Sequence, residues 1–487
     1  MVSNNYLRII AAMMILAFYS SSVHAQTFPS KWIFGKSYAE KMNNTWEEYG
    51  YIVATVAGEG IMSAADKSGN NLRRCKVIEG RPAIASVKAG DCFLFTLPVE
   101  SLSAGSFIGF DATLTAEPGA PKRWGVEWED GKQWKTGREY LCHGPALGSA
   151  HTYTSIHQVF KMENAVEGCS VKVRLRALEG DVIPPMEDIQ STGSAMLVSS
   201  TYLGAYVQNL GTSQPEDTTR ILCLGNSFTY YHSSPAMLKE IAWREGHYLD
   251  VSVSVKGGRS MKHHQTLPMT LDNIAAGGFD VAILQDQSKA AAWVGQARKN
   301  NAHHLKEIAV RADMIRATSG ECDFVVERTW SYPGKKHAGF GSINAFDTYS
   351  KKGVKAMARA VGNARVSQIA EAFKYCREEH PDIMLYHTDS YHPSVYGSYL
   401  KSCVNYLVLF GEPFGDDPAD CGIDSAKAAV LRSIAERTVL KRSGKSLSCC
   451  KSYSKGKKKQ NKDECADAAG NVAVRNIECD IIPERNR

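Results

Sequence analysis

The stretch Ile221–Tyr230, with the sequence ILCLGNSFTY, constrains the fold of this chain more than any other part of it. The short apolar run Ile221–Leu224 is typical of a buried strand, and Gly225-Asn226 ends it. Ser227 follows in the turn, and a helical pattern covers Ser234–Glu245. A serine in a strand-to-helix turn lies at the carboxyl edge of a sheet, where open α/β folds hold their ligands. The stretch therefore predicts an α/β fold with Ser227 at that edge.

A distant stretch, Asp389-Ser390-Tyr391-His392-Pro393-Ser394, supplies an Asp and a His three positions apart. A neutral serine is a poor nucleophile and needs a base that takes its proton during attack. His392 is the candidate base, and Asp389 would orient the imidazole and stabilise its charged form. The alternative makes Asp389 a turn residue and His392 a surface histidine. The pairing with Ser227 favours nucleophilic catalysis.

These residues, in this order, resemble the SGNH (GDSL-like) hydrolase superfamily. Gly225-Asn226-Ser227 is similar to its first block, which carries the nucleophile, and Asp389-x-x-His392 is similar to its last block. Lys256-Gly257-Gly258-Arg259-Ser260 resembles the glycine block, and Leu284-Gln285-Asp286-Gln287-Ser288 occupies the place of the Gly-x-Asn-Asp block. The motif sequences are most similar to those of a bacterial branch with Gly-Asn-Ser-Phe-Thr, Leu-Gln-x-x-Ser and Asp-x-x-His-Pro-Ser. The resemblance covers Thr218 to Gly411.

The resemblance also implies an oxyanion hole. Its donors would be the backbone amides of Ser227 and Gly258 and, in the family, an Asn side chain. In this chain Gln285 or Gln287 would have to replace that Asn, with the same carboxamide on a longer stem. Asn226 stands where the family usually has Asp, and a neutral residue there leaves the role of base to His392.

Aromatic residues are the candidate substrate-binding side chains, because they could frame the pocket and stack on a sugar ring: Tyr230, Tyr231, Trp293, Trp330 and Tyr391. Each is alternatively a structural residue. His263-His264 and His303-His304 suggest a metal site, but adjacent side chains diverge and no acidic partner has ligand spacing. We therefore expect neither a metal nor a cofactor.

The chain falls into four predicted segments. Residues Met1–Ala25 have the pattern of a secretory signal peptide, with the apolar run Ile9–Ala17 too short to span a bilayer. Residues 26–211 form a predicted all-β domain, and the polar stretch Gly211–Asp217 links it to a predicted catalytic domain at residues 218–442. Residues 443–487 form a basic tail with four Cys, either solvated or tied by disulfides.

In the first large segment, short runs rich in β-branched and aromatic residues alternate with turn residues. This pattern predicts a β-sandwich or jelly roll, with strands at Tyr51–Ala57, Cys92–Pro98, Ser106–Ala116, Trp124–Trp128, Cys169–Leu178 and Met196–Val207 and a helix at Lys36–Tyr49. Trp124, Trp128 and Trp134 are either core aromatics or a platform that stacks on sugars.

In the second large segment, strand-like and helical runs alternate, which predicts βαβ units and a parallel sheet. The predicted strands are Ile221–Leu224, Leu249–Val255, Val281–Leu284, Phe324–Val326 and Ile383–Tyr386. The predicted helices are Ser234–Glu245, Ala302–Ala317, Asp347–Val361, Ser367–Glu378 and Val395–Phe410. The expected fold is a three-layer αβα sandwich, in agreement with the resemblance.

Charge and cysteine content restrict the partners. The formal net charge of +6 is modest and no clustered basic motif occurs in the globular part, which argues against nucleic-acid binding. No second long apolar run is present, so we expect no stable membrane insertion. Export permits disulfides, and we expect at least one among Cys75, Cys92, Cys142 and Cys169. Cys223, within an apolar strand, is expected to be a buried small hydrophobe.

The leading interpretation is an exported, periplasmic or extracellular serine esterase. Its substrate would be a small acyl ester, most plausibly acetyl, on a carbohydrate, as the resemblance and the predicted export imply. The alternatives are a lipid or aryl esterase, and a carbohydrate-binding protein with an inactive hydrolase domain. The sequence leaves the glycan, the acyl position and the oligomeric state open.

Overall fold

The computed structural model describes residues 30–32, 51–52, 60–78, 81–142, 154–185, 191–197, 205–213, 217–297, 301–333 and 339–440. The predicted signal peptide, the predicted helix at Lys36–Tyr49 and the predicted tail lie outside these residues. All of the described residues belong to one compact unit. No helix in the described ranges is long and apolar enough to cross a bilayer.

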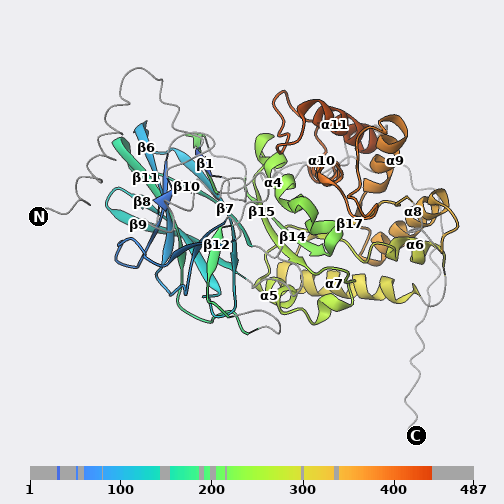
Figure 1. The fold of residues 1–487 in the computed structure, drawn as a ribbon, viewed down its shortest axis with the longest axis horizontal. Helices are drawn as coiled ribbons and strands as arrows, with labels where there is room; N and C mark the ends of the chain where they lie inside the picture. Colours follow the sequence, from blue (N-terminus) through green and yellow to red (C-terminus); the bar gives the residue numbers. More distant parts are fainter. Residues whose placement is uncertain are drawn as a thin grey trace, which may run out of the picture. The chain divides into compact units, whose positions relative to one another are not determined.

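The α/β region is built on five parallel strands, in agreement with the predicted fold (Figure 1). They are β14 (Thr219–Gly225), β15 (Leu249–Val255), β16 (Val281–Leu284), β17 (Asp323–Glu327) and β18 (Arg365–Ser367). Their order across the sheet is β18-β17-β16-β14-β15. The chain therefore winds from β14 to β15 on one side and then to β16 on the other, which makes the carboxyl end of β14 the switch point of the sheet.

Alternate residues of each strand enter two different hydrophobic cores, because successive side chains in a strand point to opposite faces. Ile221 and Cys223 of β14 lie in one core, and Leu222 and Leu224 lie in the other. The first core is covered by α4 (Ser234–Arg244), α9 (Ile369–Glu379), α10 (Val395–Phe410) and α11 (Ser425–Val439). The second is covered by α5 (Pro268–Ala276), α7 (His303–Ser319) and the second half of α8 (Ile343–Ala360). This is the predicted three-layer αβα sandwich.

The amino-terminal region is an antiparallel β-sandwich, as the sequence predicted. One sheet contains β2 (Tyr51–Ile52), β3 (Ile61–Ala65), β6 (Cys92–Leu102), β8 (Arg123–Asp130), β9 (Gln133–Leu141) and β11 (Val166–Ala177). The facing strands are β1 (Ser30–Trp32), β4 (Cys75–Ile78), β5 (Arg81–Ile84), β7 (Phe107–Ala116), β10 (Thr154–Lys161), β12 (Ala195–Leu197) and β13 (Ala205–Gly211). A single core lies between them.

The facing sheet continues into the parallel sheet, because Thr154 of β10 pairs with Ser252 of β15. Buried charges cross the same junction. Lys239 of α4 pairs with Asp111 of β7 and donates to the Ile156 carbonyl at 2.9 Å. The two regions therefore share backbone and side-chain contacts as well as a linker.

One predicted strand of the α/β region is wrong. Residues Ile383–Tyr386 do not form a strand: Tyr386 makes only an isolated bridge to Pro393, and the fifth strand is β18. Arg365–Ser367 is too short and too polar to be recognised by apolar pattern, whereas Ile383 and Leu385 are apolar because they fill the core beside α10.

The expected disulfide is also not formed. Cys75, Cys92 and Cys142 are each buried and none is in a disulfide bond. They belong to different parts of the sandwich, since Cys75 starts β4, Cys92 starts β6 in the other sheet, and Cys142 follows β9. Burial raises the pKa of the Cys75 thiol to about 12, so these cysteines act as small hydrophobic residues. Cys223 is buried in the same way, as expected.

Candidate active site

Ser227 is the first residue of the single-turn helix α3 (Ser227–Tyr230), at the carboxyl end of β14. Asn226 has extended backbone angles and caps the helix, because its side chain accepts a hydrogen bond from the Phe228 amide at 3.1 Å. A residue at the start of a helix has no intrahelical acceptor for its own N–H. The Ser227 amide is therefore available at the point where the hydroxyl also projects.

Ser227, His392 and Asp389 lie in a hydrogen-bonded row. The Ser227 Oγ is 2.8 Å from His392 Nε2, and His392 Nδ1 is 2.6 Å from Asp389 Oδ2. A carboxylate can only accept, so Nδ1 carries the proton and Nε2 accepts from the Ser227 hydroxyl. This is the arrangement that a serine nucleophile and its base require.

The acid and base share one tight loop after α9. Asp389 Oδ1 accepts the backbone amides of Tyr391 and His392, at 2.9 and 3.0 Å, and Ser390 has a φ of 55°. Partial burial opposes ionisation of Asp389, but the hydrogen bonds from the His392 side chain and from these amides outweigh it and lower the pKa of the carboxyl. Asp389 is therefore ionised at neutral pH, which holds the His392 tautomer.

Aromatic rings pack against the imidazole from two directions. Tyr231 stacks on His392 with ring centroids 4.1 Å apart and planes 3° from parallel. Tyr391 meets the same ring edge-on at 4.7 Å, and its hydroxyl lies 2.8 Å from Ser288 Oγ. These contacts leave His392 little freedom to rotate away from Ser227.

The glycine block lies beside the nucleophile. Asn226 Nδ2 donates to the Arg259 carbonyl at 2.8 Å, and Lys256 N–H donates to the Gly225 carbonyl at 3.1 Å. Gly258 has a φ of +67°, a conformation that suits glycine. Its N–H makes no hydrogen bond to any described residue, so it can serve as a donor to an oxyanion.

The two candidate glutamines have different environments. Gln285 is buried, its Oε1 accepts the Asn226 amide at 3.0 Å and the Thr229 hydroxyl at 2.9 Å, and its Nε2 donates to the Asp286 carbonyl. Both ends of its carboxamide are therefore engaged in holding the nucleophile turn. Gln287 is half-buried, its Oε1 accepts the Lys289 amide at 2.7 Å, and its Nε2 has no acceptor within the described part of the chain. Gln287 is thus the candidate third donor.

Asp286 and His264 are positioning residues that the sequence reasoning missed. Asp286 accepts from the amides of Met261 and Gln287, at 2.8 and 2.7 Å, and from His304 Nδ1 at 2.8 Å. His264 Nε2 lies 3.0 Å from the Gly225 carbonyl, and burial lowers the pKa of this imidazole to about 4. Asp286 stands within the recognised Gln285–Ser288 stretch and His264 within the His263-His264 pair, but neither pattern indicates a positioning role.

The other predicted substrate-binding aromatics are not equivalent. Trp330 is 1% exposed and lies between Phe228 and Phe373, with both ring centroids at 4.5 Å. It therefore supports the nucleophile turn from the core and offers no free face, which corrects its predicted role. Tyr230 is buried next to Gly257, whose added Cβ would lie 3.0 Å from the Tyr230 hydroxyl. Trp293, on α6 (Ala290–Gly295), is half-buried and stacks on His304 at 5.7 Å.

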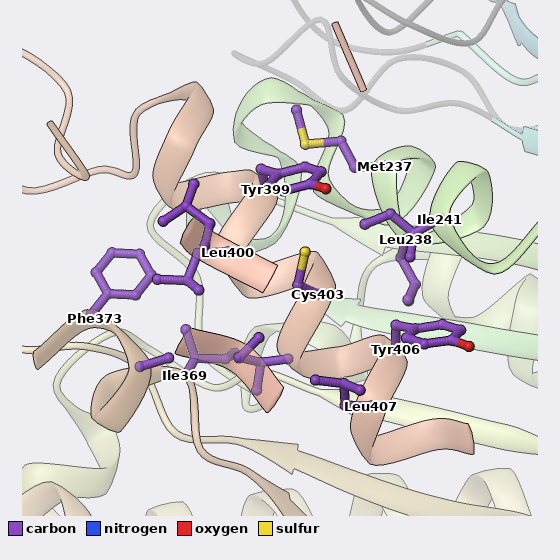
Figure 2. Packing of buried hydrophobic residues seen from close by; sticks show 14 of the residues in the cluster. Met237, Leu238, Ile241, Ile369, Phe373, Tyr399, Leu400, Cys403, Tyr406 and Leu407 are labelled. Atoms are coloured by element: carbon purple, nitrogen blue, oxygen red, sulfur yellow. The ribbon is translucent and has the colours of Figure 1, made fainter. Parts of the chain in front are cut away.

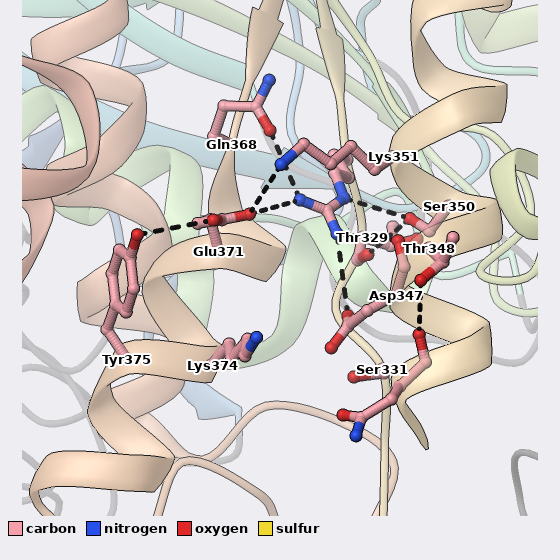
Figure 3. Close-up of polar contacts among 12 residues, drawn as sticks. Thr329, Ser331, Asp347, Thr348, Ser350, Lys351, Gln368, Glu371, Lys374 and Tyr375 are labelled. Atoms are coloured by element: carbon pink, nitrogen blue, oxygen red, sulfur yellow. Dashed lines mark hydrogen bonds and ion pairs between the residues drawn. The ribbon is translucent and has the colours of Figure 1, made fainter. Parts of the chain in front are cut away.

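A buried polar cluster anchors the segment that carries Trp330. Figure 3 shows Asp347 and Ser350 of α8 and Glu371 of α9 gathered around one guanidinium. That group belongs to Arg328, which pairs with Glu371 at 3.0 Å and donates to the Asp347 carbonyl at 2.9 Å. The neighbouring Thr329 hydroxyl donates to the Ser288 carbonyl at 2.8 Å. The cluster therefore joins two helices to the wall of the site.

The two histidine pairs contact other groups of the protein. His264 and His304 point to a carbonyl and a carboxylate respectively, and the described residues contain no group of three or more His, Cys, Asp or Glu that could hold a metal ion. The three tryptophans of the sandwich do not form one platform either. Trp124 is fully buried, Trp128 stacks on Phe160 at 4.5 Å, and Trp134 is covered by the Arg174 guanidinium at 3.9 Å.

Comparisons with known proteins found distant structural similarity only. No protein-family model matches the chain, and no curated protein matches it. A DUF4886 family protein from Bacteroides uniformis is 20% identical, with 46% of this chain and 95% of that chain covered and a TM-score of 0.39. A carbohydrate esterase family 2 enzyme plus carbohydrate-binding domain from Corynascus thermopiles is 11% identical, with 63% and 94% covered and a TM-score of 0.31. A lipase/acylhydrolase from Enterococcus faecalis is 12% identical, with 39% and 95% covered and a TM-score of 0.30.

Proposed function

We propose that this chain, whose αβα region has the SGNH hydrolase-like fold, is a serine ester hydrolase. The observation that carries the proposal is the row Ser227–His392–Asp389, with consecutive distances of 2.8 and 2.6 Å. Hydrogen-bond donors without described partners, the Gly258 N–H and Gln287 Nε2, occur on the two loops that flank Ser227. A nucleophile, a base, an orienting acid and oxyanion donors are the parts that acyl transfer needs.

The chemistry follows from these positions. His392 Nε2 takes the Ser227 proton as Oγ attacks the ester carbonyl, and the negative charge that develops on the carbonyl oxygen is stabilised by the Ser227 and Gly258 amides and by Gln287. The tetrahedral intermediate collapses, the protonated imidazole gives its proton to the leaving alkoxide, and an acyl-serine remains. Water, activated by the same His392, then releases the carboxylic acid and restores Ser227. Asp389 stays ionised throughout and stabilises the imidazolium.

We further propose that the substrate is a small acyl ester, with acetyl preferred, on a carbohydrate, and that the enzyme is exported. Surface composition favours this substrate over a lipid. Among the described residues, the exposed large hydrophobic side chains are Val182, Leu271 and Met384, which are too few for the apolar patch that binds a lipid surface. The β-sandwich adjoins the hydrolase core, because its strand β10 pairs directly with β15.

Hydrolysis of p-nitrophenyl acetate by the purified protein tests the activity. Ser227→Ala and His392→Ala should each abolish nearly all turnover, and the double variant should be little worse, because nucleophile and base act as a unit. Asp389→Ala should retain somewhat more activity. Equal rates for the wild type and Ser227→Ala would remove the enzyme proposal and leave the carbohydrate-binding alternative. If the wild type is active and Ser227→Ala is not, acetate release from a panel of acetylated polysaccharides would identify the substrate.

A further inference from the structure

Helix α10 is joined directly to the base. It begins three residues after His392, and Ser394 caps it by accepting the Gly397 amide at 3.2 Å. Figure 2 shows its buried face, with Tyr399, Leu400, Cys403, Tyr406 and Leu407 packed against residues of α4 and α9. The position of α10 therefore fixes where the loop carrying His392 ends.

The same helix also holds the nucleophile segment through three buried polar side chains. Ser398 Oγ donates to the Tyr231 carbonyl at 3.1 Å, Lys401 Nζ donates to the Phe228 carbonyl at 2.9 Å, and Ser402 Oγ donates to the Ser234 carbonyl at 2.9 Å. Residues three and four apart lie on one face of a helix. One face of α10 thus bonds to three carbonyls within the eight residues that begin at Ser227.

Lys401 is a charged group in a place where charge is costly. It is 1% exposed, and its ammonium pairs with Glu327 Oε2 at 2.8 Å. Glu327 is the last residue of β17, and its other oxygen accepts Asn405 Nδ2 at 2.8 Å. Replacing a buried ion pair by apolar residues of similar volume is often neutral or stabilising. Stability alone therefore does not account for a charged pair directly beneath the nucleophile.

We infer that Lys401, held by Glu327 and assisted by Ser398 and Ser402, is a positioning residue that keeps Ser227 in register with His392. The inference rests on the proposed function. The carbonyl of Phe228 belongs to the residue after the nucleophile, so a shift of this carbonyl moves both the Ser227 hydroxyl and its N–H. Misplacement by about 1 Å can cost on the order of a hundredfold in rate. The loss should fall on kcat, because the proposed contacts are made with the enzyme's own nucleophile turn.

The test uses Lys401→Met combined with Glu327→Gln, so that no buried charge is left without its partner. The matched control is Lys239→Met combined with Asp111→Asn. Lys239 is also buried, also paired with a buried carboxylate and also bonded to a carbonyl, but at the junction with the sandwich. We call the Lys401→Met/Glu327→Gln double variant the Lys401 pair. With p-nitrophenyl acetate, its kcat should be at least about tenfold lower than that of the wild type, while its KM should differ by less than about twofold. The control should retain its kcat at a similar change in thermal stability.

The second readout is the rate at which a fluorophosphonate labels Ser227, followed by intact mass, which needs no turnover. Labelling should slow in the Lys401 pair and not in the control. If the double variant does not fold, the smaller change Ser398→Ala replaces it, with an expected loss of several-fold in kcat. Wild-type kcat and labelling in the Lys401 pair, or an equal loss in the control, would overturn the positioning role. A wild type that matches Ser227→Ala in hydrolysis would instead overturn the proposed function itself.

Discussion

At the scale of single residues, the carboxamides of Gln285 and Gln287 have separate tasks although they stand two positions apart. Gln285 lies beneath the nucleophile turn with both ends bonded, whereas Gln287 keeps its NH₂ group without a described acceptor. The chemistry of the two side chains is identical, so sequence could not distinguish them. Their roles differ only because the two side chains point in different directions from the loop that follows β16.

Gln287→Ala should therefore lower kcat for p-nitrophenyl acetate by about a hundredfold, the cost of one oxyanion donor, with little change in stability. Gln285→Ala should instead lower the free energy of unfolding, because it leaves the buried Asn226 amide and Thr229 hydroxyl without their acceptor, at about 1–3 kcal/mol. Steady-state kinetics and urea denaturation of both variants measure this. A loss of kcat in Gln285→Ala alone, with Gln287→Ala unaffected, would reverse the assignment.

His264 gives a second residue-scale prediction, on pH. Its pKa is lowered from 6.5 to about 4 by burial, so between these values the unfolded chain binds a proton that the folded chain does not. Stability from this group is fully present above pH 6.5 and is lost as the pH falls toward 4. From pH 7 to pH 5 the loss amounts to about 2 kcal/mol.

The matched variant is His264→Gln, which does not titrate. It should be less stable than the wild type at pH 7, because the contacts with Gly225 and Thr270 are disturbed. Its free energy of unfolding in urea should then fall about 2 kcal/mol less than that of the wild type between pH 7 and pH 5. The same fall in both proteins would show that His264 does not carry this dependence.

At the scale of elements, the acid–base loop is held differently from the sequence prediction. The Asp389–His392 loop was expected to follow a strand, Ile383–Tyr386, but it follows α9 and a bridge between Tyr386 and Pro393. The loop still reaches Ser227 because α10, whose cap is Ser394, packs across α4. Helix packing thus replaces the sheet edge that the sequence reasoning assumed.

At the scale of the whole molecule, the sandwich and the α/β region have separate cores but are joined by more than the linker. Thr154 pairs with Ser252, Arg138 pairs with Asp250 at 2.9 Å, and Lys239 reaches Asp111. Such buried partners lose hydrogen bonds and expose apolar surface if the regions part. The two-domain organisation with a boundary near Gly211–Thr219 stays a prediction.

A protease site inserted at Pro215 tests how the two regions hold together. After cleavage, a denaturing gel should show two fragments, whereas gel filtration without denaturant should show a single species of the original size. Asp111→Asn in the cleaved protein should weaken the association, because it leaves Lys239 without its carboxylate. Fragments that elute separately without any substitution would show that the linker alone joins the regions.

The sequence by itself determined the strands β14, β15, β16 and β17, the five helices predicted for the α/β region, the sandwich class and the three residues of the hydrogen-bonded row. It could do so because strand and helix periodicity and the spacing of Asp389 and His392 are local patterns. Tertiary structure alone decided that Cys75, Cys92 and Cys142 form no disulfide with one another, and that Trp330 is core. It also decided that Gln287 rather than Gln285 keeps an amide group with no acceptor among the described residues, and that Lys401 lies beneath Ser227. These outcomes depend on contacts between side chains of elements that are far apart in the sequence, and a local sequence pattern carries no information about such contacts.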